Sequence, residues 1–291
     1  MVNCIEHTGK DASTMLRIVT DTASDITLEQ AAGMGVDMVP LVITFEDGVC
    51  PQETEADFMT FYERLQRCQE LPVTSRPSPH SYLKIFQDAK AKGEEVVVLC
   101  VSSGLSGTME SAFTARQMAD YEPIYIVDTR QAILTQRMLV ELAVQMREDG
   151  HTAQAIVKKV EEMRDRVVVC GVVGTLKYLR KGGRIPASLA VVGAMLNIKP
   201  VIVLEDGILK TLGKARGHSS GIAMLHKRME EDGFNRAYPL FFGYTSDRSL
   251  AEKAMIDFCE RYHVDHKRLH AIGGIIGTHC GTDCVAVAYF K

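Results

Sequence analysis

The chain of 291 residues contains no tryptophan, and aromatic residues make up only 7% of it. Basic residues are not in excess either, because 33 Lys and Arg stand against 37 Asp and Glu, which gives a net charge of -4. A protein that binds a polyanion needs a surplus of basic side chains to neutralise phosphates. The charge balance therefore argues against a nucleic-acid-binding protein.

Long apolar runs are absent as well. No stretch approaches the roughly 18 uninterrupted apolar residues of a membrane-spanning helix. Residues 1–14 are too polar for a secretory signal, since they include Glu6, Lys10 and Asp11. We treat residues 1–14 as an N-terminal extension and expect a soluble cytoplasmic protein. Most of the 8 cysteines are scattered, and several lie in apolar runs, where reduced thiols pack as small hydrophobic groups.

Hydrophobic residues nevertheless make up 46% of the chain, enough for a sizeable aliphatic core. In the first half, apolar runs such as Val96–Val101 alternate with amphipathic segments, which predicts a mostly parallel α/β sandwich over residues 15–165. Val36–Phe45 is expected to form one β-rich segment. The pattern then becomes mixed, and Asp206-Gly207 between two apolar runs predicts a β-hairpin. We expect residues 166–291 to form a C-terminal mixed α/β domain.

The most informative polar loop is Ser102–Thr108, which lies between an apolar strand and a predicted helix. Hydroxyls, glycines and helix N-terminal amides in this position favour a bound carboxylate or phosphate. The same residues also suit an ordinary helix cap with turn glycines. The loop alone leaves both interpretations open.

Two further loops carry hydroxyl or imidazole groups. Thr74–Pro79 follows a path that its prolines make rigid, although a cap for the next helix also explains it. Thr278–Cys284 is predicted to be a glycine-rich loop before the final strand, in which His279 can donate a hydrogen bond to an anion. No second pair of Cys or His with zinc-site spacing accompanies it, so we expect no metal site.

Complete catalytic motifs are missing. Gly104–Gly107 brings its second glycine one residue too early for a nucleophile elbow, and Gly207–Lys214 departs from the spacing of a phosphate-binding loop. We therefore expect no catalytic residues in the isolated chain. The alternative is a hydrolase or phosphotransferase that uses Ser103 or Ser106 with His279.

Taken together and in order, these segments resemble the DegV family. The similarity spans Leu16 to Phe290 and rests on Val19–Asp25, Thr74–Ser78, Ser102–Thr108, Leu179–Ile185 and Gly277–His279. The resemblance implies two α/β domains with a long-chain fatty acid between them and no other cofactor. It also implies a non-catalytic cytoplasmic lipid carrier, without membrane insertion, whose partner is a separate ATP-dependent fatty acid kinase of bacteria.

The resemblance also assigns roles to individual residues. The positions that hold the carboxylate correspond to Thr74, Ser103 and His279, together with the Gly104 amide. Ser75 and Ser102 neighbour these positions and are included in the predicted site. Arg184 and Arg216 match basic positions associated with the kinase partner or with a phosphorylated head group.

This sequence departs from the family pattern in two places. Arg76 stands where Gln is common, which adds a positive charge beside the expected carboxylate site. The residues Cys280–Asp283 replace the usual Thr-Gly-Pro-Gly, so that Asp283 adds a negative charge after His279.

Overall fold

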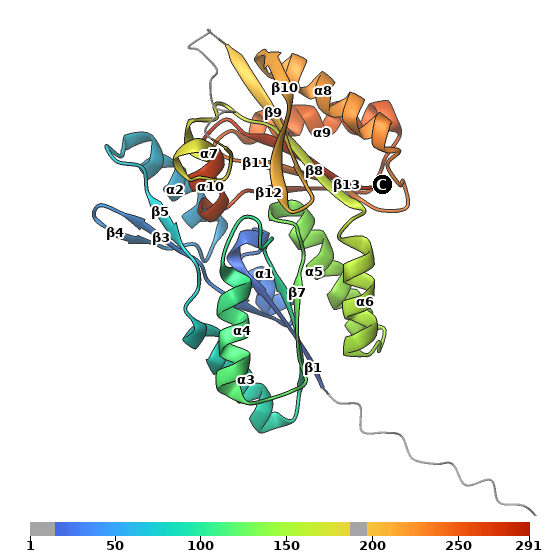
Figure 1. Cartoon of the computed structure of the whole chain (residues 1–291). Coiled ribbons are helices and arrows are strands. Elements are labelled where there is room, and N and C mark those ends of the chain that lie inside the picture. Colours follow the sequence, from blue (N-terminus) through green and yellow to red (C-terminus); the bar gives the residue numbers. More distant parts are fainter. Residues whose placement is uncertain (1–14, 187–196) are drawn as a thin grey trace, which may run out of the picture.

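The computed structural model describes residues 15–186 and 197–291. The predicted N-terminal extension and Cys4 lie outside these ranges. The strands form three sheets, and the two larger sheets come from the two halves of the sequence (Figure 1). This arrangement confirms the predicted two-domain α/β fold, with a parallel sheet followed by a mixed one. The domain boundary near Asp165 stays a prediction.

The first sheet is parallel in its described strands, which follow the order β2-β1-β6-β7. The inner strand β6 contains the apolar run that begins at Val96, and it is buried on both faces, as expected for a parallel strand. Helices α3 and α4 pack on one face, and α1, α5 and α6 on the other (Figure 1). The bounds are Leu16–Asp21 (β1), Thr22–Ser24 (a 3-10 turn, η1), Leu28–Gly33 (α1), Val36–Val39 (β2), Pro79–Lys92 (α3), Glu95–Cys100 (β6), Thr108–Ala119 (α4), Ile124–Asp128 (β7), Ile133–Glu148 (α5) and Ala153–Met163 (α6).

The second sheet has the order β10-β9-β8-β13-β11-β12 and combines parallel with antiparallel pairs. Side chains alternate between its faces, so Val168 and Cys170 pack beneath α8 and α9, whereas Val169 packs towards the first sheet. The predicted hairpin at Asp206-Gly207 is confirmed as the β9–β10 connection. The bounds are Val167–Val172 (β8), Lys177–Lys181 (α7), Ile198–Glu205 (β9), Ile208–Arg216 (β10), Gly217–Asp232 (α8), Leu240–Tyr244 (β11), Arg248–Tyr262 (α9), Lys267–Ala271 (β12), Gly274–Cys280 (α10) and Val285–Phe290 (β13).

A third, small sheet has the order β4-β3-β5. The β-rich segment expected over Val36–Phe45 is confirmed, but it divides at Pro40 into two strands. Proline lacks a backbone N–H and cannot continue the ladder, so β2 joins the parallel sheet while β3 joins the small sheet. Pairing of β3 with β5 places Thr74 opposite Ile43. The bounds are Val42–Phe45 (β3), Gly48–Cys50 (β4), Glu55–Arg67 (α2) and Val73–Ser75 (β5).

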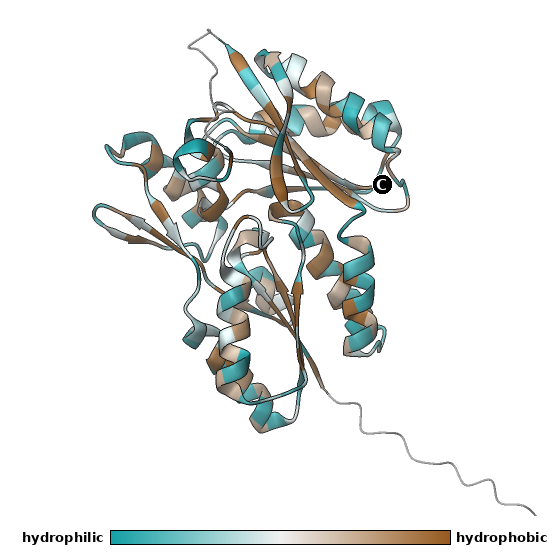
Figure 2. Ribbon diagram, in the orientation of Figure 1, coloured by the Kyte–Doolittle hydropathy of each residue, from teal (hydrophilic) through white to brown (hydrophobic). Residues whose placement is uncertain are grey.

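Two helices connect the halves. Helix α5 lies between the two large sheets and contacts both, with residues such as Leu139 fully buried (Figure 1). Helix α10 belongs to the second half by sequence, yet it packs on α2, β3 and β5 of the first half. Figure 2 shows that the strands of both large sheets are mainly hydrophobic, whereas the surrounding helices carry both kinds of residue.

The helices are also short relative to a bilayer. Within residues 15–186 and 197–291, none is both long enough and apolar enough to cross a membrane.

Candidate ligand-binding cavity

An apolar cavity lies between the two halves of the molecule. It contains about 950 Å³ of space, its open mouth included. The first half contributes β5, the loop after β6 and the start of α5, and the second half contributes β8, β9, β10 and α10. Most of the lining is aliphatic and includes Leu41, Leu105, Ile133, Leu179, Ile202 and Ile275.

Polar side chains gather at one end of this cavity. Thr74 Oγ1, on β5, lies 3.0 Å from His279 Nε2, on α10. The lining also includes Ser75 and Arg76, which follow Thr74 in the chain, as well as Arg184. Ser75 and Arg76 are exposed to solvent, so the polar end is where the cavity opens to the surface.

The prediction that His279 lies in a loop is wrong, because it lies in the last turn of helix α10. Burial and, to a lesser degree, the positive charge of Arg184 lower the pKa of His279 to about 4. The imidazole is therefore neutral at pH 7, with one ring nitrogen as donor and the other as acceptor. Nδ1 is buried and has no hydrogen-bond partner among the described residues.

The paired glycines near the cavity explain how the imidazole fits. A Cβ atom at Gly182 would collide with the His279 ring. Because Gly182 has no side chain, the His279 ring can pack directly against its backbone. Gly183, by contrast, has a positive φ of 70° and turns the chain.

Arg184 brings an uncompensated positive charge to the polar end. Its Nε donates to the Leu105 carbonyl oxygen at 3.1 Å, and its Nη1 donates to the Gly182 carbonyl. No carboxylate of the described residues forms an ion pair with it, whereas the exposed Arg76 pairs with Glu110. Burial lowers the pKa of Arg184, but a guanidinium stays protonated at neutral pH. A half-buried cation without a counterion favours an anionic ligand.

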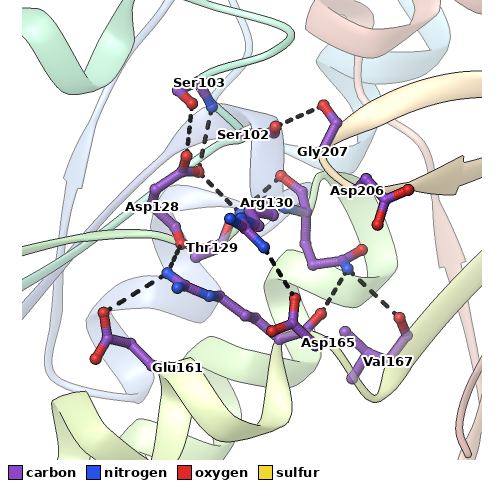
Figure 3. Close-up of polar contacts among 12 residues, drawn as sticks. Ser102, Ser103, Asp128, Thr129, Arg130, Glu161, Asp165, Val167, Asp206 and Gly207 are labelled. Atoms are coloured by element: carbon purple, nitrogen blue, oxygen red, sulfur yellow. Dashed lines mark hydrogen bonds and ion pairs between the residues drawn. The ribbon is translucent and has the colours of Figure 1, made fainter.

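The first part of the Ser102–Thr108 loop points away from the cavity. Ser103 donates to the Asp128 carboxylate twice, from Oγ at 2.5 Å and from its amide at 3.2 Å (Figure 3). Ser102 Oγ donates to the Gly207 carbonyl at 2.7 Å, and the Gly104 amide donates to Ser102 Oγ. None of these three residues lines the cavity. Their role in holding a carboxylate stays a prediction.

Ser106 is the hydroxyl of this loop that does line the cavity. Its Oγ lies 2.9 Å from Thr108 Oγ1 at the start of α4. Sequence reasoning considered Ser106 only as an alternative nucleophile. The sequence signal for Ser106 is its position two residues before helix α4. The unpaired amides of a helix lie in its first turn, so a residue at this position is close to them.

The remaining predicted residues lie outside the cavity. Arg216 ends β10 and is exposed. Asp283 does not line the cavity either, and its backbone carbonyl faces His218 Nε2 at 3.2 Å. Thr74, Ser75, His279 and Arg184 are therefore brought together, whereas Ser102, Ser103, Gly104 and Arg216 are not part of that group.

The positions of these residues also concern the alternative of a hydrolase or phosphotransferase that uses Ser103 or Ser106 with His279. The Ser103 hydroxyl is held by Asp128 and does not reach the cavity that contains His279. Among the residues that the structure describes, no three His, Cys, Asp or Glu side chains are grouped so that they could hold a metal ion.

These features define a two-domain α/β protein with an apolar cavity between its halves and polar groups at the mouth. A family model described as an uncharacterised protein of the DegV family matches residues 15–291. Because the match covers nearly the whole chain, the protein belongs to the DegV family.

Several known proteins are similar over their full length. A DegV domain-containing protein of Caldanaerobacter subterraneus is 30% identical over 280 residues, which cover 94% of this chain and 98% of that protein. A DegV family protein from Thermus thermophilus, whose solved structure is described as fatty acid binding, has a TM-score of 0.88 and 26% identity, with 96% and 100% of the two chains covered. A stearic acid-binding protein from Eubacterium ventriosum has a TM-score of 0.85 and 26% identity, with 95% and 98% covered.

The lowered pKa of His279 predicts a pH dependence of stability. In the unfolded chain the imidazole titrates near its ordinary value of about 6.5, whereas in the folded chain it titrates at about 4. The folded state thus binds the proton less readily, so the stabilising contribution is present above pH 6.5 and is lost as the pH falls towards 4. Between pH 7.5 and pH 5, we expect this group to lower the free energy of unfolding by about 1–2 kcal/mol.

Urea unfolding of the wild type and of His279→Gln at both pH values measures this contribution. Glutamine does not titrate, so the variant should lose less stability on acidification by that amount. His270, whose pKa is lowered to about 3 by burial, titrates in both proteins and cancels in the comparison. Equal pH dependence in the two proteins would contradict the assignment.

Proposed function

We propose that this protein binds a long-chain fatty acid, with the acyl chain in the apolar cavity and the carboxylate at its polar end. The observation that carries this proposal is Arg184, a half-buried cation in an aliphatic cavity with no carboxylate partner among the described residues. The similar structures described as fatty acid binding support the same class of ligand.

The aliphatic walls account for the preference for a long chain. Each methylene removed from water contributes about 0.8 kcal/mol, so about ten methylenes contribute about 8 kcal/mol before the cost of association is subtracted. Short-chain acids lack most of this contribution. The cavity therefore favours long acyl chains, whose tails lie between the first and second halves of the protein.

The head group is held by charge and by hydrogen bonds. Arg184 supplies the countercharge, and hydrogen bonds from a guanidinium to a carboxylate are among the stronger ones in proteins. Thr74 supplies a hydroxyl from strand β5, and Ser106 supplies one from the loop after β6. His279 is neutral and contributes a hydrogen bond without a further charge.

The protein is, in our proposal, a non-catalytic carrier that presents the carboxylate to a separate ATP-dependent fatty acid kinase. This part of the proposal is supported by the resemblance of its motifs to the family. The structure is compatible with it because the polar end opens to solvent beside Ser75 and Arg76. Arg216 is exposed outside the cavity, where a partner protein can reach it.

A comparison of two ligands tests the carboxylate site. We expect the delipidated protein to bind palmitate at least about tenfold more tightly than hexadecanol, because only the acid offers a charge to Arg184. In Arg184→Gln this preference should fall to less than about threefold. Isothermal titration calorimetry measures both affinities. The matched control is Arg130→Gln, which removes an arginine paired with Asp165 outside the cavity and should keep the preference.

Two outcomes would contradict the proposal. Equal affinity of the wild type for the acid and the alcohol would exclude a carboxylate site. Absence of binding to both ligands would exclude lipid binding altogether.

Substitution of the two serines distinguishes their placements. We expect Ser106→Ala to weaken palmitate binding about fivefold, because its hydroxyl lines the cavity. Ser103→Ala should stay within about twofold of the wild type, since its hydroxyl is used by Asp128. A larger loss in Ser103→Ala than in Ser106→Ala would instead support the assignment made from the family resemblance.

The kinase partnership is tested with Arg216→Ala. This variant should bind palmitate within about twofold of the wild type, because Arg216 lies outside the cavity. Its acyl phosphate formation with the fatty acid kinase of the same organism should be at least about tenfold slower. Unchanged formation of acyl phosphate would exclude Arg216 as a partner contact.

A further inference from the structure

We propose that Asp25, together with Tyr62, positions His279 at the head-group site by holding the N-terminal end of helix α10 against the first half of the chain. The inference rests on the proposed function, because it takes His279 as part of the carboxylate site. Asp25 acts through α10 and is a positioning residue, since it does not line the cavity.

The contact between Asp25 and α10 links distant parts of the sequence. Asp25 follows the turn η1 and is only 2% exposed. Its Oδ1 accepts a hydrogen bond of 2.9 Å from the Gly273 amide, 248 residues later and directly before α10. Asp25 adopts a left-handed backbone conformation with φ 55°. This conformation is sterically unfavourable for most residues other than glycine, asparagine and aspartate.

Neighbouring residues of the first half complete this attachment. The Tyr62 hydroxyl donates to the Ile272 carbonyl at 2.8 Å, and the Gln52 side-chain oxygen accepts from the Gly274 amide. Three consecutive residues, Ile272–Gly274, are therefore held by side chains from the other half of the molecule. The second half holds the same segment at a further point, since the Ile272 amide donates to the Tyr244 carbonyl at 2.7 Å.

The packing of α10 leaves little freedom for sliding. A Cβ atom at Gly274 or at Gly277 would collide with Phe61, and at Gly277 it would also collide with Tyr62. The helix is only seven residues long, so at 1.5 Å per residue it spans about 10 Å, and its close packing opposes bending over so short a length. A displacement at the Gly273 end is therefore transmitted to His279.

The opposite end of this rod carries the head-group contact. His279 Nε2 lies 3.0 Å from Thr74 Oγ1, and a side-chain contact stretched to about 3.6 Å or bent below about 120° is no longer a good hydrogen bond. Thr74 belongs to the first half, as Asp25 does. The two ends of α10 are thus attached to the same half, one through Asp25 and the other through Thr74.

Burial of the Asp25 carboxyl group costs free energy unless its oxygens form hydrogen bonds. Oδ2 of Asp25 is buried and has no hydrogen-bond partner among the described residues. Burial raises the pKa of Asp25 well above its ordinary value, although the nearby charge of Arg137 opposes this shift. Buried polar groups with incomplete hydrogen bonding are uncommon and are often found where function requires them.

The test follows His279 in the ligand-free protein, so that it does not depend on fatty acid binding. The titration of His279 is measured by NMR on protein labelled with 13C at histidine Cε1, with the signal assigned through His279→Gln. In the wild type the titration midpoint should lie near pH 4. The charged side chain that contributes to the low pKa of His279 is Arg184, and none of the variants replaces it.

Asp25→Gly removes the side chain without straining the left-handed backbone. We expect its His279 midpoint to rise by about one pH unit or more towards the value of an exposed imidazole, and palmitate affinity to fall about tenfold. Asp25→Asn keeps the Oδ1 acceptor and tolerates this conformation, so it should restore the wild-type midpoint and affinity. Tyr62→Phe removes only the hydroxyl and should shift the midpoint in the same direction as Asp25→Gly.

The control for general destabilisation is Phe86→Leu, in the cluster on the opposite face of the parallel sheet. It should lower stability and leave the His279 midpoint unchanged. An unchanged midpoint in Asp25→Gly, or an equal shift in Phe86→Leu, would overturn the proposal. If Asp25→Gly does not fold, an unchanged midpoint in Tyr62→Phe overturns it. A shifted midpoint in a protein that binds no palmitate would contradict the proposed function and leave the positioning role intact.

Discussion

The hydrogen bond between Thr74 and His279 is the contact on which the candidate site depends. It joins residues that are 205 positions apart, so it exists only when both halves of the chain are folded and docked. Thr74 is placed by the pairing of β5 with β3, and His279 by the packing of α10 on α2. The polar end of the cavity is therefore a product of the interface between the halves.

Two sets of hydrogen-bond donors bear on the proposed carboxylate site, and they differ in their partners. In the loop after β6, Ser103 donates to the Asp128 carboxylate and the Gly104 amide donates to Ser102 Oγ, so both donors have partners within the protein. Arg184, in contrast, has two backbone carbonyls as its hydrogen-bond partners among the described residues and faces an aliphatic cavity. Because a charge in such surroundings gains most from a counterion, the guanidinium is the stronger basis for recognising a carboxylate.

Local patterns in the sequence predicted the two-domain fold correctly. The apolar run of β6 and the Asp-Gly turn between β9 and β10 each act within a few residues, so they can be recognised without the rest of the chain. The division at Pro40 was missed because both neighbouring segments are strands, and only the tertiary structure assigns them to different sheets. Similarity to the family extended the prediction to the cavity between the halves.

The site was harder to predict because its contacts are not local. Residues 274–280 contain two glycines and favour a loop by intrinsic propensity, yet they form a helix that packs on Phe61 and Tyr62. The direction of Ser103 is likewise set by Asp128, which belongs to another strand. Thr74, His279 and Arg184 were identified from their motifs, whereas their mutual placement follows from long-range packing.

In our proposal, the polar end of the cavity binds an ionised carboxylate beside Arg184. The most direct measurement is 13C NMR of palmitate labelled at its carboxyl carbon and bound to the protein, followed as a function of pH. We expect a single bound signal that remains in the ionised form below pH 5, because the guanidinium lowers the pKa of a carboxyl group next to it. A bound carboxyl that becomes protonated above its ordinary range of about 4–5 would show burial without a countercharge and would contradict the account.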